Sequence, residues 1–225
     1  VVFALDRGGI VGDDGPTHHG LFDYSYLRSI PNLTVMAPKD ENELRDMLKT
    51  AVSLGTPCSV RYPRGKGTGV PPRAPVLLEK GKAEILREGR DLFIFAIGST
   101  VSPALEAARA LEADGIGAGV VNCRFVKPLD EELLLAKALA AGIVLTVEEN
   151  VLMGGFGSAV LEVLEKRRAY GVKVVRLGIS DEFVEHGSQD LLRAMYGIDA
   201  SGIAESARRL LQKAPEALME AADAD

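Results

Sequence analysis

The sequence predicts an α/β protein of two domains, each built on a mainly parallel sheet flanked by helices. Short apolar runs alternate with amphipathic stretches of helical period through most of the 225 residues. Between residues 65 and 75, three Gly and three Pro without hydrophobic periodicity interrupt this alternation once. The composition, 47% hydrophobic and 26% charged, is ordinary for a globular protein with its own cores.

The first domain is predicted from three strands. We expect a buried parallel strand over residues 1–5, a short strand over 33–37, and a third over 58–61. A glycine-rich loop follows the first strand, and residues 21–30 have helical or irregular character. Because the chain opens without Met directly on an apolar strand, we expect it to be a fragment of a longer protein.

One helix of this domain has well-marked boundaries. Asp40 is expected to be its N-cap, with its side chain accepting a hydrogen bond from the backbone amide of Glu43. Gly55 and Pro57 end the helix. Its apolar residues are predicted to form a single stripe: Leu44, Met47, Leu48 and Ala51.

The second domain repeats strand and helix with a regular alternation that calls for a mainly parallel sheet. Strands are expected over 92–97, 116–121, 143–147 and 172–177, and helices over 129–138, 156–168 and 203–212. Two more helices are expected, one from Ser99 with Val101, Leu105, Ala108 and Leu111 on one face, the other between a Ser188 cap and Gly197. We place the first domain at residues 1–66, the linker at 67–82 and the second domain at 83–225.

Charge and composition exclude several classes of protein. The net charge of -6 argues against a nucleic-acid-binding domain, which normally shows a basic face. No apolar run is long enough to cross a bilayer, and no secretory signal is visible. Cys58 and Cys123 lack the spacing of a zinc site or a redox pair, so we expect reduced core thiols in a soluble, cytoplasmic protein.

Two arginines follow two strands of the first domain. Arg7 comes after the strand that ends at Leu5, and Arg64 comes after the strand that ends near Tyr62. In a parallel sheet both would project at the carboxyl edge, where two guanidinium groups can hold a phosphate. The alternative is that Arg7 pairs with Asp13 or Asp14 and Arg64 with a surface acid. The pattern alone favours neither.

Two of the three histidines lie in the same glycine-rich loop. One of His18 and His19 is expected to turn inward, and an inward imidazole beside Asp14 could relay protons near neutral pH. The alternative is a histidine whose ring only makes hydrogen bonds that hold the loop together. Two adjacent histidines without a third ligand do not make a zinc site, and we expect no metal ligands in this chain.

A second glycine-rich segment, residues 154–158, stands at the start of a predicted helix. Its amides could hold a phosphate, but the segment lacks the full dinucleotide-binding pattern. We therefore interpret it as a site of tight helix packing. His186 is interpreted in the same way as a loop residue and not a ligand.

Several motifs closely resemble those of the 1-deoxy-D-xylulose-5-phosphate synthases, a transketolase-like family of thiamine diphosphate enzymes. The resemblance covers nearly the whole chain. It rests on the runs 6–18, 22–23, 25–28, 30–31, 40–43 and 60–65, and in the second domain on 98–99, 122–130 and 148–150.

The resemblance implies that the chain holds the latter half of a pyrimidine-binding domain and the whole transketolase C-terminal-like domain. The family condenses pyruvate with glyceraldehyde 3-phosphate, releasing carbon dioxide, to give the precursor of isoprenoids, thiamine and pyridoxal. Thiamine diphosphate supplies the carbanion chemistry. The ligands of thiamine diphosphate and Mg²⁺ are expected mainly outside this chain, in the N-terminal part of the same enzyme, and a homodimer is expected.

Site residues are carried over by the same resemblance. Arg7 and Arg64 are expected to bind the phosphate of the aldehyde acceptor. Asp14 and His18 are expected to hydrogen-bond its hydroxyl and carbonyl, with His18 a candidate proton donor. Another transketolase-family enzyme (a transketolase or a 2-oxo acid dehydrogenase β subunit) and a noncatalytic assembly module remain as alternatives.

Overall fold

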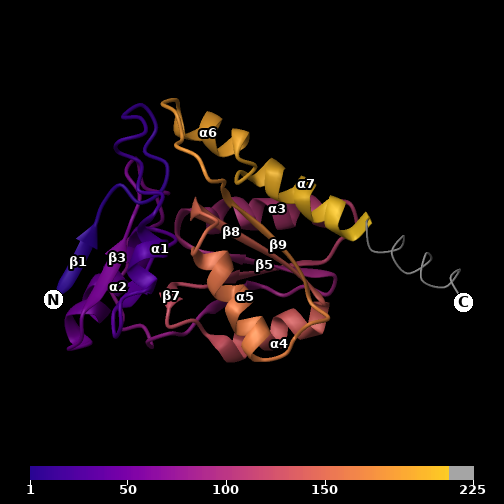
Figure 1. Ribbon diagram of the computed structural model, residues 1–225, viewed down its shortest axis with the longest axis horizontal. Coiled ribbons are helices and arrows are strands. Elements are labelled where there is room, and N and C mark those ends of the chain that lie inside the picture. The colour runs from indigo at the N-terminus through magenta and orange to yellow at the C-terminus, as the bar shows by residue number, and fades with distance from the viewer. Residues whose placement is uncertain (213–225) are drawn as a thin grey trace, which may run out of the picture.

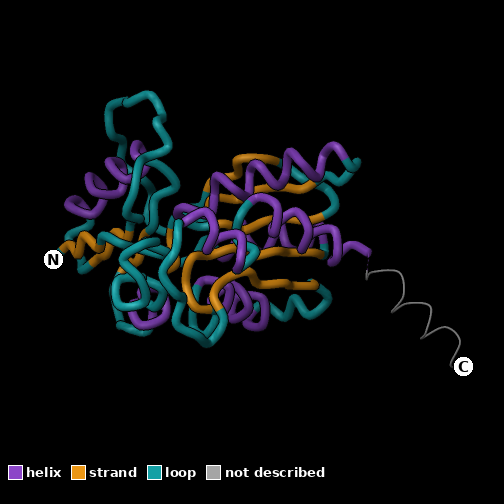
Figure 2. The backbone as a smooth tube through the Cα atoms, turned by 90° about the horizontal axis from the view of Figure 1, so that it is seen from above, coloured by secondary structure: helices purple, strands orange, loops and turns teal. Residues whose placement is uncertain are grey.

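The computed structural model describes residues 1–212; the last part of the second domain as predicted, residues 213–225, lies outside the described residues. It contains a four-stranded sheet of order β1-β3-β2-β7 and a five-stranded sheet of order β4-β6-β5-β8-β9. Figure 1 shows the smaller sheet with β1, β3 and α2 at the N-terminal side and the larger sheet beside it. The N-terminus and the end of α7 lie at opposite ends of the molecule (Figure 2).

The smaller sheet is built mainly from the first part of the chain. Strands β1 (Val2–Leu5) and β2 (Thr34–Met36) both run parallel to β3 (Cys58–Arg61), and β7 (Phe125–Lys127) pairs antiparallel with β2. The helices of this part are α1 (Asp23–Arg28) and α2 (Glu41–Ser53). As predicted, the Asp40 side chain caps α2 by accepting from the Glu43 amide.

The larger sheet carries the second part of the chain. Its strands are β4 (Glu84–Arg87), β5 (Leu92–Ala96), β6 (Ala118–Asn122), β8 (Ile143–Val151) and β9 (Lys173–Ile179). All neighbours pair in parallel except β4, which is antiparallel to β6. The helical elements are η1 (Gly98–Thr100), α3 (Val101–Ala113), α4 (Glu131–Ala141), α5 (Phe156–Lys166), α6 (Gln189–Met195) and α7 (Ala200–Gln212).

Helices cover both faces of the larger sheet. Residues of α3 and α7 pack on one face in a single buried cluster, and residues of α4 and α5 pack on the other (Figure 1). The second cluster also contains Tyr24 and Leu27 of α1 and Val35 of β2. The core on that face therefore joins the two parts of the chain.

The segment after β3 runs without helix or strand to β4, as its Gly and Pro content predicts. It is held along α2 by hydrogen bonds from Asn42 and Arg45 to the carbonyl oxygens of Pro71 and Arg73. The buried Asp46 carboxylate also binds the guanidinium of Arg73. This segment has no hydrophobic core of its own, and polar contacts with α2 hold it in place.

The structure corrects some predictions. The strand over residues 1–5 exists but is not buried, since Phe3 is 46% exposed: within residues 1–212, β1 pairs only with β3 and lies at the edge of the sheet. Met47 and Ala51 of the predicted stripe are buried, but Leu48 is exposed, because the buried face of α2 also includes the polar residues Glu43, Asp46 and Thr50. The short antiparallel strands β4 and β7 were not predicted. Among the described helices, none has the length and apolar character needed to cross a membrane.

Candidate functional site

Arg7 and Arg64 lie at the same edge of the smaller sheet. The register pairs Leu5 of β1 with Arg61 of β3, so both arginines follow the carboxyl ends of adjacent parallel strands. Both guanidinium groups contact the Oδ2 atom of Asp14: the Nε of Arg7 is 3.8 Å away, and the Nη1 of Arg64 makes a closer ion pair. Their convergence on one oxygen shows that one small anion could contact both.

The shared carboxylate is accessible to solvent. The side chain of Asp14 is 27% exposed, and those of Arg7 and Arg64 are 45% and 49% exposed. A hollow of about 260 Å³ beside Asp14 and Arg64 is lined by residues of three segments: 11–14, 64–65 and 188–189. Charged groups at an open edge exchange partners at low cost, because solvent screens each ion pair.

Arg7 itself has an unusual backbone conformation, with a φ of 56°. Its carbonyl oxygen accepts from the Gly20 amide, and the next amide, that of Gly8, donates to the carbonyl oxygen of Tyr62 at 2.9 Å. A non-glycine residue in the left-handed region is strained and persists only where its surroundings fix it. The loop therefore holds Arg7 in one geometry relative to the end of β3.

The two histidines separate as the pattern predicts, one inward and one outward. His19 is buried; its Nδ1 accepts from the Val11 amide at 3.0 Å and its Nε2 lies 3.2 Å from the carbonyl oxygen of Glu185. His18 is exposed, and its Nδ1 lies 3.0 Å from the Thr17 hydroxyl. The inward imidazole thus supports the loop, while the His18 ring remains accessible.

Arg61 is buried beneath the loop. Its guanidinium donates to the carbonyl oxygens of Gly20 and Glu149, its Nε binds the Asp23 carboxylate at 3.1 Å, and it lies 4.2 Å from the ring centre of Tyr24. Burial raises the pKa of Tyr24 to about 12, so its hydroxyl stays protonated. These contacts fix the Arg61 guanidinium beneath the loop.

Two of three consecutive buried residues of β8, Glu149 and Asn150, join the two parts of the chain. The Glu149 carboxylate accepts from the Ile10 amide at 3.1 Å and from the Arg193 guanidinium. Asn150 accepts from the Tyr24 amide at 3.1 Å through its Oδ1. Glu148 accepts from the amides of α5. The sequence contained this motif, but its partners are distant in sequence and were not predictable from it.

The glycine-rich segment 154–158 binds a carboxyl group from within the protein. The amides of Phe156 and Gly157 donate to the buried Glu148 carboxylate at 2.7 and 2.8 Å. A Cβ atom at Gly157 would lie 2.7 Å from the Thr146 hydroxyl, which confirms the predicted tight packing. His186 is an exposed loop residue, also as predicted.

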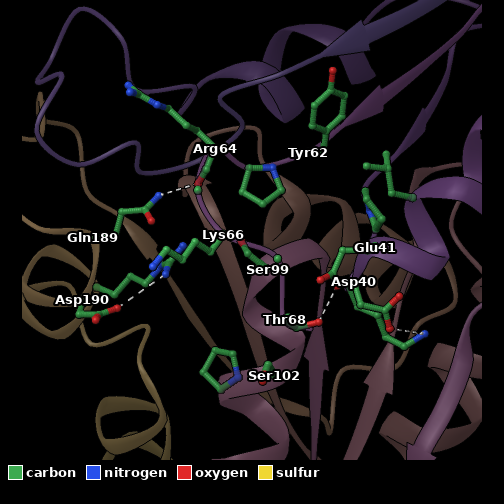
Figure 3. A pocket seen from close by; sticks show the side chains of 18 of the residues that line it. Asp40, Glu41, Tyr62, Arg64, Lys66, Thr68, Ser99, Ser102, Gln189 and Asp190 are labelled. Atoms are coloured by element: carbon green, nitrogen blue, oxygen red, sulfur yellow. Dashed lines mark hydrogen bonds and ion pairs between the residues drawn. The ribbon is translucent and has the colours of Figure 1, made fainter. Parts of the chain in front are cut away.

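Helix α6 supplies residues that the sequence analysis did not assign to the site. Gln189 contacts both the loop after β1 and the segment after β3, and Figure 3 shows it joined to the Arg64 backbone at the rim of a larger hollow of about 620 Å³. The Arg64 side chain extends away from this hollow, toward Asp14. No local pattern identifies Gln189, because its contacts span more than 120 residues.

Two further predictions concern metal ligands and the two cysteines. Within residues 1–212, no three His, Cys, Asp or Glu side chains come together in an arrangement that could hold a metal ion. Cys58 and Cys123 are free and buried, as expected for core thiols. Burial raises the pKa of both, so neither is a reactive thiolate near neutral pH.

Comparison with known families divides the chain into two matched parts. Residues 1–68 match the family described as the transketolase pyrimidine binding domain. Residues 81–203 match the family described as the transketolase C-terminal domain.

Curated relatives carry a consistent name. The chain is 60% identical over 222 residues to a 1-deoxy-D-xylulose-5-phosphate synthase of Syntrophus aciditrophicus, covering 98% of this chain and 34% of the relative. It is 61% identical over 212 residues to 1-deoxy-D-xylulose-5-phosphate synthase 1 of Geobacter sulfurreducens, covering 94% and 33%. The chain therefore spans about a third of the length of these relatives.

A solved structure has the same arrangement. It is described as a split gene transketolase, an inactive β4 tetramer, and superposes with a TM-score of 0.79 at 34% identity. The match covers 94% of this chain and 66% of that one. The mainly parallel sheets flanked by helices are thus those of a known transketolase architecture.

Proposed function

The chain belongs to the transketolase family, and from that premise we propose that it supplies the acceptor-binding part of a 1-deoxy-D-xylulose-5-phosphate synthase. That enzyme condenses pyruvate with glyceraldehyde 3-phosphate and releases carbon dioxide. Relatives of this name at 60% and 61% identity support the proposal. The observation that carries it is the meeting of the Arg7 and Arg64 guanidinium groups at one carboxylate oxygen.

We assign the phosphate of the acceptor to these two arginines. A guanidinium group binds phosphate oxygens through paired, charge-assisted hydrogen bonds. Asp14 neutralises both groups in the structure, and its partial exposure allows an incoming phosphate to take its place. Displaced from the arginines, the Asp14 carboxylate is free to accept a hydrogen bond from the acceptor's hydroxyl group.

We assign a proton-donating role to His18. The carbonyl oxygen of the acceptor gains negative charge as the new carbon–carbon bond forms, and an imidazolium can donate a proton to it near neutral pH. The exposed ring of His18 leaves it free to do so, whereas the His19 ring is engaged by the loop. His18 and Asp14 are the catalytic candidates of this chain.

Thiamine diphosphate supplies the carbanion chemistry of this reaction when bound. As the family resemblance implies, we assign Mg²⁺ and the diphosphate contacts to the N-terminal part of the same enzyme, working within a homodimer. On this proposal, residues 1–66 complete the pyrimidine-binding domain, 67–82 are the linker and 83–225 form the C-terminal domain.

The polypeptide by itself is expected neither to bind thiamine diphosphate tightly nor to turn over. The split gene transketolase that it resembles is described as inactive, which supports this expectation. Calorimetry on the purified chain tests it: micromolar binding of the cofactor would contradict the division of ligands proposed here.

The acceptor assignment is tested by arginine variants of the complete enzyme. Arg7→Ala and Arg64→Ala are each expected to lower kcat/KM for glyceraldehyde 3-phosphate about 30-fold to 100-fold, since each removes a charged contact to phosphate. The KM for pyruvate should change little. Arg109→Ala, at an exposed arginine of α3, is the control for loss of one positive charge. Equal activity in all three variants would refute the proposal.

A further inference from the structure

Gln189 is the first residue of α6 and belongs to the second part of the chain, yet it contacts both arginine-bearing segments. Its side-chain Nε2 donates to the carbonyl oxygen of Ile10 at 2.6 Å and to that of Arg64 at 3.1 Å. The orientation of the amide is determined by these partners, because a carbonyl oxygen can only accept. One NH₂ group thus joins the loop after β1 to the segment after β3.

Two glycines fit against the same side chain. Gly12 has a φ of 88°, and a Cβ there would lie 3.3 Å from the Gln189 Cγ. Gly65 has a φ of 125°, and a Cβ there would lie 3.2 Å from the Gln189 Oε1. Each arginine-bearing segment therefore approaches Gln189 closely at a position whose backbone conformation favours glycine.

Neighbouring contacts extend this junction along residues 185–193. The carbonyl oxygen of Glu185 lies 3.2 Å from the Nε2 of His19. At the other end, Arg193 binds the Glu149 carboxylate that accepts from the Ile10 amide. Ile10 is consequently held on both sides, its carbonyl by Gln189 and its amide by Glu149.

We propose that Gln189 is a positioning residue that sets the spacing between Arg7 and Arg64, and through it the affinity for the acceptor's phosphate. This inference rests on the proposed function. Arg7 and Arg64 stand on separate segments, and their guanidinium groups can share a phosphate only while those segments keep their spacing. Gln189 donates to the backbone of both, so the second domain adds a tie between the segments to those that the loop and β3 already make.

Kinetics of the complete enzyme test this role. Gln189→Met keeps the length of the side chain and removes both donors, and is expected to raise the KM for glyceraldehyde 3-phosphate about fivefold to tenfold, the effect of one or two lost hydrogen bonds. The KM for pyruvate and kcat/KM for unphosphorylated glyceraldehyde should stay within about twofold, as expected for an effect confined to the phosphate. Gln189→Glu places a carboxylate against the two carbonyl oxygens, and should raise the KM for glyceraldehyde 3-phosphate more than Gln189→Met does.

Leu191→Ala is the matched control, since this residue of the same helix is 57% exposed. Hydrogen exchange on the chain itself supplies a readout apart from activity: Gln189→Met should speed exchange of residues 8–15 and leave residues 92–96 unchanged.

The outcomes separate the two proposals. Unchanged exchange with an unchanged KM for the phosphorylated acceptor overturns the role of Gln189 alone, as does an equal loss with both acceptors. A wild-type enzyme that does not favour the phosphorylated acceptor overturns the proposed function and this inference with it.

Discussion

Two glycine-rich segments of this chain have sequences suited to binding an anion, and the structure treats them differently. At residues 154–158, two amides at the start of α5 bind the carboxylate of Glu148, which is fully buried. After β1, the guanidinium groups of Arg7 and Arg64 contact the carboxylate of Asp14, whose side chain is 27% exposed. Each segment already holds a carboxylate supplied by the protein.

The difference lies in exposure. A buried carboxylate cannot leave its partners without exposing unpaired amides, so the contact at α5 contributes to stability. A carboxylate at an open edge can give way to a ligand, because its ion pairs are weak in water. Both segments are rich in glycine. What distinguishes the structural element at α5 from the candidate site after β1 is the exposure of the carboxylate that each one holds.

The largest expected effect comes from removing the buried carboxyl group of Glu148. Glu148→Ala leaves the amides of Phe156 and Gly157 without a partner and opens a cavity, so the free energy of unfolding should fall by about 3 kcal/mol. Urea denaturation of the chain near pH 7 measures this loss.

The control is Glu165→Ala, at an exposed glutamate of the same helix, which should change the free energy of unfolding by less than about 0.5 kcal/mol. Similar losses in the two variants would mean that the contact at α5 is not structural, and the comparison would fail.

The pH dependence of stability gives the next largest effect. Burial raises the pKa of Glu148 to about 7, against the two amide hydrogen bonds that lower it. Between about pH 5 and 7 the folded state then keeps a proton that the unfolded state has lost. The free energy of unfolding therefore falls as pH rises through this window, on the order of 2 kcal/mol in total.

Glu148→Gln removes this titration, so the difference in unfolding free energy between wild type and variant should shift between pH 5 and pH 8. A constant difference across that range would show that Glu148 is ionised throughout. Burial would then not set the protonation state of Glu148 apart from that of the exposed Asp14.

The smallest expected effect concerns the exposed anion. Asp14→Asn removes the carboxylate that competes for Arg7 and Arg64, so inorganic phosphate should bind the chain about threefold to fivefold more tightly. Asp13→Asn changes the net charge equally at an exposed neighbour and is the control. Titration of both variants with phosphate, followed by NMR, measures the difference. Equal tightening in the two variants would show that net charge alone is responsible.

The elements of the fold were largely predictable from sequence. Asp40 and Ser188 cap their helices as predicted, and the strand β3 has the predicted bounds. These features depend on neighbours within a few residues. The strands β4 and β7 were missed because both are short, antiparallel and added at sheet edges by distant pairing. Burial of β1 was predicted wrongly for a related reason, since an apolar run does not reveal whether its strand is central or at an edge.

For the candidate site, the sequence by itself determined that Arg7 and Arg64 each follow a predicted parallel strand, but not that these two strands are neighbours, which the register of β1 with β3 establishes. Only the tertiary structure decided that Asp14 lies between them, that His19 and not His18 turns inward, and that Gln189 joins the two segments. The physical reason is the distance along the chain between interacting residues. Strand direction and helix capping follow from local chemistry, whereas a partner more than 120 residues away is chosen by how the whole chain packs.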